Sequence, residues 1–153
     1  MSRFLEVVTT FLEEDRWPVG VEQNGELPRV TTRFSGTSAS WECRLRILEP
    51  FGQVIVESAI PLRVPEGLRP AIGELILRIN WRLLTGAFQL DSDTGDLLFR
   101  TSIVLQDGEP LTRGVIKGLI YSNVLTVDRC YSELAAAVEG IRSPDDALVR
   151  LAL

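Results

Sequence analysis

Apolar residues recur with helical spacing at the start of the chain. The stripe follows Ser2, which can cap a helix, and it ends before Pro18, because proline disfavours helical geometry at the residue that precedes it. Its members lie at i, i+1, i+4, i+7 and i+8 and are Phe4, Leu5, Val8, Phe11 and Leu12. The pattern predicts a first helix over about residues 2–16.

Two further stripes predict longer helices. The second begins between Glu66 and Pro70 and stops at Gly86, and its apolar members are Leu68, Ile72, Leu75, Ile76, Ile79 and Leu83. The third covers about residues 111–138, with members Val115, Leu119, Val124, Val127, Tyr131, Leu134 and Val138, widened by Ile116, Ile120 and Leu125. An apolar face this broad packs on a sheet or on a second subunit. Ser143 and Pro144 start a short fourth helix.

Alternating apolar and polar residues predict five strands, over about residues 29–35, 40–48, 53–64, 88–90 and 97–103. In the second strand Trp41, Cys43, Leu45 and Ile47 point one way, and Glu42, Arg44, Arg46 and Leu48 point the other. Turn signals stand at Asn24-Gly25, Gly36–Ser38, Pro50–Gly52 and Asp91–Asp96. Short turns between alternating segments predict an antiparallel sheet with one face buried and the other at least partly in water.

The predicted order of elements is α-β-β-β-α-β-β-α. We therefore predict an α+β fold, in which an antiparallel five-stranded sheet carries its helices on one face. A chain of 153 residues is expected to form a single domain over residues 1–153. Its core would cover about residues 28–140, and residues 143–153 would form a short helical tail.

Charge and composition narrow the classes of partner and of compartment. The net charge of −5 and the pI near 4.8 give no general attraction to phosphate backbones or anionic lipid, so we expect no nucleic-acid or membrane partner. No window approaches 18 apolar residues, and the first residues do not read as a signal peptide. Cys43 and Cys130 belong to no C-x-x-C pair, and we expect two reduced structural thiols in a cytoplasmic protein.

The chain has no histidine, which removes the common nucleophile systems and the usual zinc ligands. The segment Asp91–Asp96 superficially resembles a calcium loop. Counted from Asp91, however, glycine falls at position 5 and Ser102 at position 12, where an EF-hand needs glycine at position 6 and glutamate at position 12. We interpret it as a hairpin turn. No catalytic residue, metal ligand or cofactor site is predicted.

Two weaker sets of candidate binding residues remain. Arg29, Arg33, Arg44 and Arg46 project from neighbouring strands and form a basic stripe on the open face of the sheet, unless they pair across strands with Glu42, Glu49 and Glu57. Trp81 lies off the main stripe of the second helix, between Asn80 and Arg82. With Arg78 and Arg82 it is a candidate contact with a partner or a second subunit, and the alternative is packing against the third helix. Trp41 is expected in the core.

The run I79-N-W-R-L-L-T-G86-A-F-Q-L-D91, followed by G95-D-L-L-F-R100, resembles the YbjN-type family, described as putative bacterial sensory transduction regulators. The W41-E-C-R strand and the V124-L-T-V-D128-R-C-Y131-S-E-L134 segment are similar to the same family, and the similarity covers about residues 28–140. The resemblance implies a bacterial protein with the fold of type III secretion chaperones, often dimeric. It carries no catalytic residue over to this chain.

Two hypotheses for the function follow. The first is a non-enzymatic binding module, chaperone-like or regulatory, that works as a homodimer and contacts another protein or peptide segment. The second is a domain that binds a small anionic ligand or works as an enzyme through arginine and carboxylate side chains, with Arg29, Arg33, Arg44 and Arg46 holding the anion.

Overall fold

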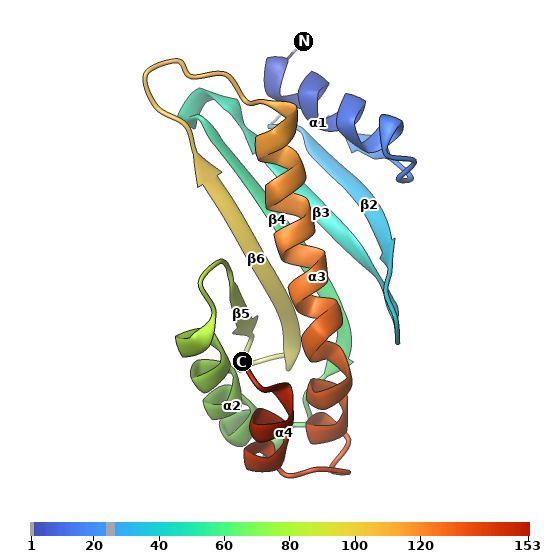
Figure 1. Ribbon diagram of the computed structural model, residues 1–153, viewed down its shortest axis with the longest axis vertical. Coiled ribbons are helices and arrows are strands. Elements are labelled where there is room, and N and C mark those ends of the chain that lie inside the picture. Colours follow the sequence, from blue (N-terminus) through green and yellow to red (C-terminus); the bar gives the residue numbers. More distant parts are fainter. Residues whose placement is uncertain (1, 24–26) are drawn as a thin grey trace.

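The computed structural model describes residues 2–23 and 27–153 (Figure 1). The helices are α1 (Arg3–Glu14), α2 (Arg69–Arg82), α3 (Arg113–Val138) and α4 (Pro144–Leu151), with single 3₁₀ turns η1 (Glu49–Phe51) and η2 (Glu66–Leu68). The strands are β1 (Gly20–Glu22), β2 (Arg29–Ser35), β3 (Ser40–Leu48), β4 (Gln53–Arg63), β5 (Ala87–Leu90) and β6 (Asp96–Val104). The predicted α+β class is confirmed. The predicted Asn24-Gly25 turn lies outside the described residues.

The sheet has six strands, so the prediction of five was wrong. The strand order is β1-β2-β3-β4-β6-β5, and every neighbouring pair is antiparallel. The additional strand, β1, has only three residues, and all three are exposed. Such a strand has no apolar alternation, which is the signal that identifies half-buried strands in a sequence.

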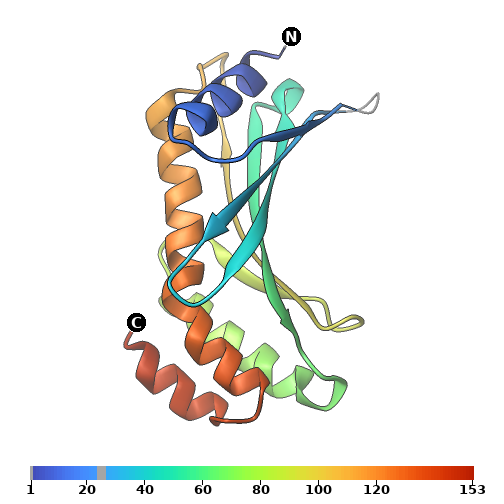
Figure 2. The same cartoon turned by 90° about the vertical axis from the view of Figure 1, so that its right-hand side faces the viewer.

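All four helices lie on one face of the sheet, as predicted (Figures 1 and 2). The long helix α3 crosses this face and contacts β4, β6, α1 and α4. The four inward side chains predicted for β3 are all buried. Leu125 was predicted to widen the apolar stripe of α3, and this was wrong. Its side chain is 53% exposed, because the sheet covers a narrower face of α3 than the apolar residues could fill.

Side chains cap the N-terminal ends of three of the helices in the described residues. Ser2, Thr112 and Ser143 each accept a hydrogen bond from a backbone N–H in the first turn of α1, α3 and α4 respectively. Glu49 Oε1 accepts two more, from Arg3 N at 3.1 Å and Phe4 N at 3.3 Å. These bonds tie the start of α1 to η1, at the end of the β3 strand.

The outer edge of β5 is covered by one side chain of α2. Asn80 Nδ2 donates to the carbonyl oxygen of Phe88 at 3.0 Å, and the N–H of Phe88 donates to Asn80 Oδ1 at 2.9 Å. The amide of Asn80 therefore takes the place that a neighbouring strand would occupy. This pair of bonds also fixes α2 against the sheet.

Candidate functional site

The first candidate site is the open face of the sheet, the face that carries no helix. β1 and β2 at one end of the molecule and the β5–β6 hairpin at the other project on this side, away from the helices (Figure 2). The register places ten charged side chains on this face. They are Glu22, Arg29, Arg33, Glu42, Arg44, Arg46, Glu57, Arg63, Asp96 and Arg100.

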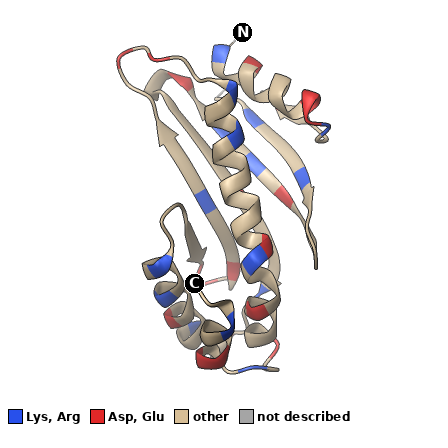
Figure 3. Cartoon of the chain, in the orientation of Figure 1, with Lys and Arg blue, Asp and Glu red and all other residues tan. Residues whose placement is uncertain are grey.

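This face is basic although the chain as a whole is acidic. Six of the ten charged side chains are arginine and four are carboxylates, whereas the whole chain carries a net charge of −5. Figure 3 shows the basic positions as blue bands on β2, β3 and β6. The basic stripe predicted on the open face is therefore present. Arg63 and Arg100, which were not among its predicted members, occupy outward positions with the same two-residue alternation.

Cross-strand ion pairs engage part of the stripe. Glu57 lies between two guanidinium groups, with its Oε2 atom 2.7 Å from Arg100 and its Oε1 atom 3.3 Å from Arg46. Arg44 pairs with Glu42 of its own strand at 2.7 Å. Glu57 thus pairs across strands, as the alternative predicted, whereas Glu42 pairs within its own strand. Glu49 does not pair across strands, because its carboxylate is bonded to the start of α1.

The β2 end of the stripe is the least neutralised part. Among the residues that the structure describes, Arg29 and Arg33 form no ion pair within 4.0 Å. Arg29 stands directly opposite Arg46 in the β2–β3 register, and Arg33 stands opposite Glu42. Like charges at directly opposed positions of a sheet repel each other. Glu22, which stands opposite Arg29 on β1, and Glu57, which pairs with Arg46, offset part of this repulsion.

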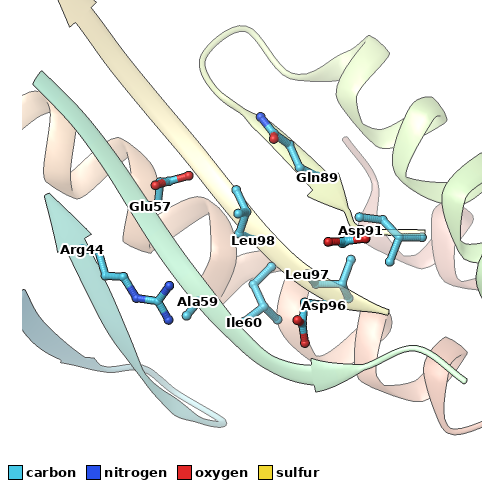
Figure 4. Close-up of a pocket in the computed structure, with 10 residues that line it drawn as sticks. Arg44, Glu57, Ala59, Ile60, Gln89, Asp91, Asp96, Leu97 and Leu98 are labelled. Atoms are coloured by element: carbon cyan, nitrogen blue, oxygen red, sulfur yellow. The ribbon is translucent and has the colours of Figure 1, made fainter. Parts of the chain in front are cut away.

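A hollow of about 540 Å³ opens at the other end of the same face (Figure 4). Ala59, Leu98 and Gln89 contribute to its lining, and Arg44 reaches from β3 toward β4 at its side. Glu57, Asp91 and Asp96 supply its acidic groups. With three carboxylates and one guanidinium group in its lining, the hollow is an acidic end of the open face beside the basic stripe.

The Asp91–Asp96 turn at this hollow is a hairpin turn, as interpreted from the sequence. Asp91 Oδ1 accepts from Asp93 N at 2.9 Å, and Asp96 Oδ2 accepts from the Thr94 hydroxyl at 2.9 Å. The Thr94 bond, followed by the bond from Arg63, lowers the pKa of Asp96 below its usual value. Within residues 2–23 and 27–153, no three His, Cys, Asp or Glu side chains gather as a metal site.

The second candidate site is an apolar ridge on α2 and the residues after it. We call Leu77, Trp81 and Leu84 the α2 ridge; all three side chains are exposed, and that of Trp81 is 90% exposed. The predicted alternative for Trp81, packing against α3, is therefore wrong. Leu77 and Leu84 were not singled out from the sequence, although their positions off the main stripe of α2 could have identified them.

Arginine side chains flank the α2 ridge. Arg78 NH1 lies 2.8 Å from Asp145 Oδ1 and so joins α2 to α4. A shallow depression of about 620 Å³ is lined by Leu77, Arg78, Asn80, Trp81 and Arg82. The predicted contact set is thus together on one surface, since Trp81, Arg78 and Arg82 all line this depression.

Sequence comparison agrees with the resemblance seen in the motifs. The sequence model of the YbjN family, described as "Putative bacterial sensory transduction regulator", matches residues 5–136. The chain belongs to the YbjN family. The match to the YbjN family runs from α1 through most of α3, so it includes the open face and the α2 ridge. No curated protein matches the chain.

No helix in the described part of the chain is long and apolar enough to cross a bilayer.

Proposed function

We propose that this YbjN-family protein is a non-enzymatic regulatory module that works as a homodimer and binds another protein in a chaperone-like manner. The observation that carries the proposal is the α2 ridge. An indole that is 90% exposed, flanked by two exposed leucines, is costly to leave in water. Tryptophan is also the residue most enriched among the energetic centres of protein interfaces.

A second copy of the chain fits the ridge by symmetry. In an antiparallel arrangement of two α2 helices, a two-fold axis near Ile79 brings Leu77 opposite Trp81 of the partner subunit. The same axis brings exposed Glu74 opposite Leu84 of the partner subunit, with Arg82 of the partner subunit about two residues, or roughly 3 Å along the helix, nearer the axis. Apolar contact at the centre with opposite charges at both ends is the self-complementary pattern that a two-fold dimer requires.

The chemistry of the chain supports a binding role over catalysis. The sequence contains no histidine, and the family is described as a regulator. The alternative, a small-anion site or an enzyme built from Arg29, Arg33, Arg44 and Arg46, is less favoured. These side chains are spread along two strands of an open face, and two of them already pair with carboxylates. Cytoplasmic location is part of the proposal, and the free thiols of Cys43 and Cys130 support a reducing compartment.

Sedimentation velocity tests the dimer. At about 100 μM protein, where a moderately weak dimer is populated by mass action, we expect twice the chain mass of 17.0 kDa. Trp81→Ala and Leu77→Ala should shift the equilibrium to monomer. Phe51→Ala is the matched control, because Phe51 is an exposed aromatic residue in η1 that is not part of the ridge. A wild-type monomer at this concentration, or a dimer that Trp81→Ala leaves unchanged, would refute the proposal.

A further inference from the structure

We infer that the open face of the sheet binds an extended acidic segment of another protein. This rests on the proposed binding of another protein and names its surface and chemistry, and the surface is a different one from the α2 ridge of the proposed dimer. The surface is the basic stripe with Ala59 and Leu98 beside it; the rest of the hollow lies outside the surface, because Glu57, Asp91 and Asp96 outnumber Arg44 in its lining. The partner is defined by its chemistry, a polypeptide in extended conformation with carboxylates at alternate positions.

Charge complementarity is the first argument. The ten charged side chains that the register places on the open face carry an excess of two positive charges, which Asp91 of the hollow reduces to one, although the chain carries −5 overall. A basic face on an acidic molecule orients an acidic partner toward that face and repels it from the rest of the surface. Among the described residues Arg29 and Arg33 form no ion pair within 4.0 Å, so a carboxylate at the β2 end of the stripe meets two guanidinium groups that have no such pair.

The spacing of the arginines is the second argument. Arg44 and Arg46 are two residues apart on β3, which separates their Cα atoms by roughly 6.8 Å, and Arg29 and Arg33 span about twice that distance on β2. A small anion reaches one or two of these groups. In an extended segment, every second side chain lies on the same side, with the same period of about 6.8 Å. Carboxylates at alternate residues of the segment therefore meet successive arginines.

The apolar surface between the charges is the third argument. Ile55 points to the open face, opposite Arg46 of β3 and Ser102 of β6 in the register, but it is only 8% exposed and offers almost no contact surface. The half-buried side chains of Ala59 and Leu98, which line the 540 Å³ hollow, supply the apolar surface instead. An extended segment therefore finds apolar contact as well as charge, which separates this face from a purely electrostatic surface.

The test uses the full-length chain and fluorescence anisotropy. The probe is a labelled peptide of alternating Glu and Thr, and the control probe is the same peptide with Lys in place of Glu. We expect the acidic peptide to bind and the basic peptide not to bind. The affinity should fall as salt is raised, because the stripe is exposed to solvent. Millimolar citrate should displace the peptide far less effectively, per carboxylate, than unlabelled acidic peptide does.

Two charge reversals locate the site. Arg33→Glu should weaken binding about tenfold or more, and Arg150→Glu less than about threefold, because both variants change the net charge equally but Arg150 lies on α4 at the helix side. Arg33→Gln should fall between them. A Trp81→Ala variant should retain full peptide binding, so failure of the dimer and failure of this proposal give different results.

Three results would each overturn the inference. One is wild-type protein that does not bind the acidic peptide or binds the basic peptide equally well. Another is an equal loss of affinity for the acidic peptide in the Arg33→Glu and Arg150→Glu variants. The third is citrate that competes as well as the peptide per carboxylate, which would make the face a small-anion site.

Discussion

The hydroxyl of Ser58 donates a hydrogen bond of 2.6 Å to Asn123 Oδ1, joining β4 to α3 in the buried core. The same hydroxyl accepts from the indole N–H of Trp41 at 2.9 Å. The amide nitrogen of Asn123 donates to the carbonyl oxygens of Val56 at 2.9 Å and Phe99 at 3.1 Å. Because these bonds link α3 to side chains and backbone of three strands, they fix the helix in one position along the sheet.

Replacing Asn123 should be strongly destabilising. Asn123→Ala leaves the Ser58 hydroxyl and two strand carbonyls without their partner and opens a cavity, so we expect a loss of about 3 kcal/mol in the free energy of unfolding. Urea denaturation followed by circular dichroism measures it. The neighbouring Ser122→Ala is the control, since this part-buried hydroxyl makes one local bond of 3.3 Å, and we expect a loss below about 1 kcal/mol. Equal losses in the two variants would contradict the role assigned to Asn123.

Truncating Trp41 and truncating Trp81 should change the free energy of unfolding by very different amounts. Trp41 is 1% exposed, contacts Phe34 and Tyr131, and bonds to Ser58, so Trp41→Ala should cost roughly 3–5 kcal/mol. Trp81→Ala should change stability by less than about 0.5 kcal/mol in monomeric protein, because its side chain packs little within the chain. Thermal and urea unfolding at low protein concentration compare the two. A large loss for Trp81→Ala in the monomer would show that this residue supports the fold itself.

The two cysteines should be inert until the chain unfolds. Burial raises the pKa of each thiol, Cys43 and Cys130, to about 11, so almost no reactive thiolate is present near neutral pH. Ellman's reagent should therefore react slowly with folded protein and rapidly with both thiols in guanidinium chloride. A rapid reaction of either thiol in the folded protein would contradict the burial of that side chain.

Asp15 should make stability depend on pH in the acid range. Hydrogen bonds to its carboxylate from the Tyr121 hydroxyl, at 2.5 Å, and the Trp17 indole, at 2.9 Å, lower its pKa. A lowered folded-state pKa contributes stability above the ordinary aspartate pKa, and this contribution is lost as the pH falls through the folded value. Urea midpoints between about pH 6 and pH 3 should fall less steeply in Asp15→Asn than in wild type.

The control for this prediction is Asp107→Asn, in the exposed loop before α3. It should leave the wild-type slope unchanged. The bond from Tyr121 has a second effect, because it raises the pKa of the Tyr121 phenol above its usual value. The phenolate absorbance of this residue should therefore appear at higher pH than that of Tyr121 in unfolded protein.

The fold could be predicted wherever side chains alternate between core and water. The residues of β3 show this best, since every apolar position predicted to face inward is buried. The alternation does not determine which strands are neighbours, and nothing in the local pattern indicated that β6 lies between β4 and β5. Long-range pairing depends on how the whole core closes, which no window of the sequence records.

The candidate sites could be predicted only in part for a related reason. The positions of Arg29, Arg33, Arg44 and Arg46 on one face followed from their spacing, but the placement of Glu57 between Arg46 and Arg100 depends on the order of three strands. Asn123 was missed because a polar residue within an apolar stripe carries no sign of its partners. The bond of Ser58 to α3 joins residues 65 positions apart in the chain, which no local pattern indicates.

The side chain of Asn80 limits how copies of this protein can join. Phe88 is near the middle of a four-residue strand, and both of its outward backbone groups are already bonded. A sheet with one closed end can be lengthened only from the other, at β1. Two copies joined there present closed ends on both sides, so growth of the sheet by strand pairing stops at a pair.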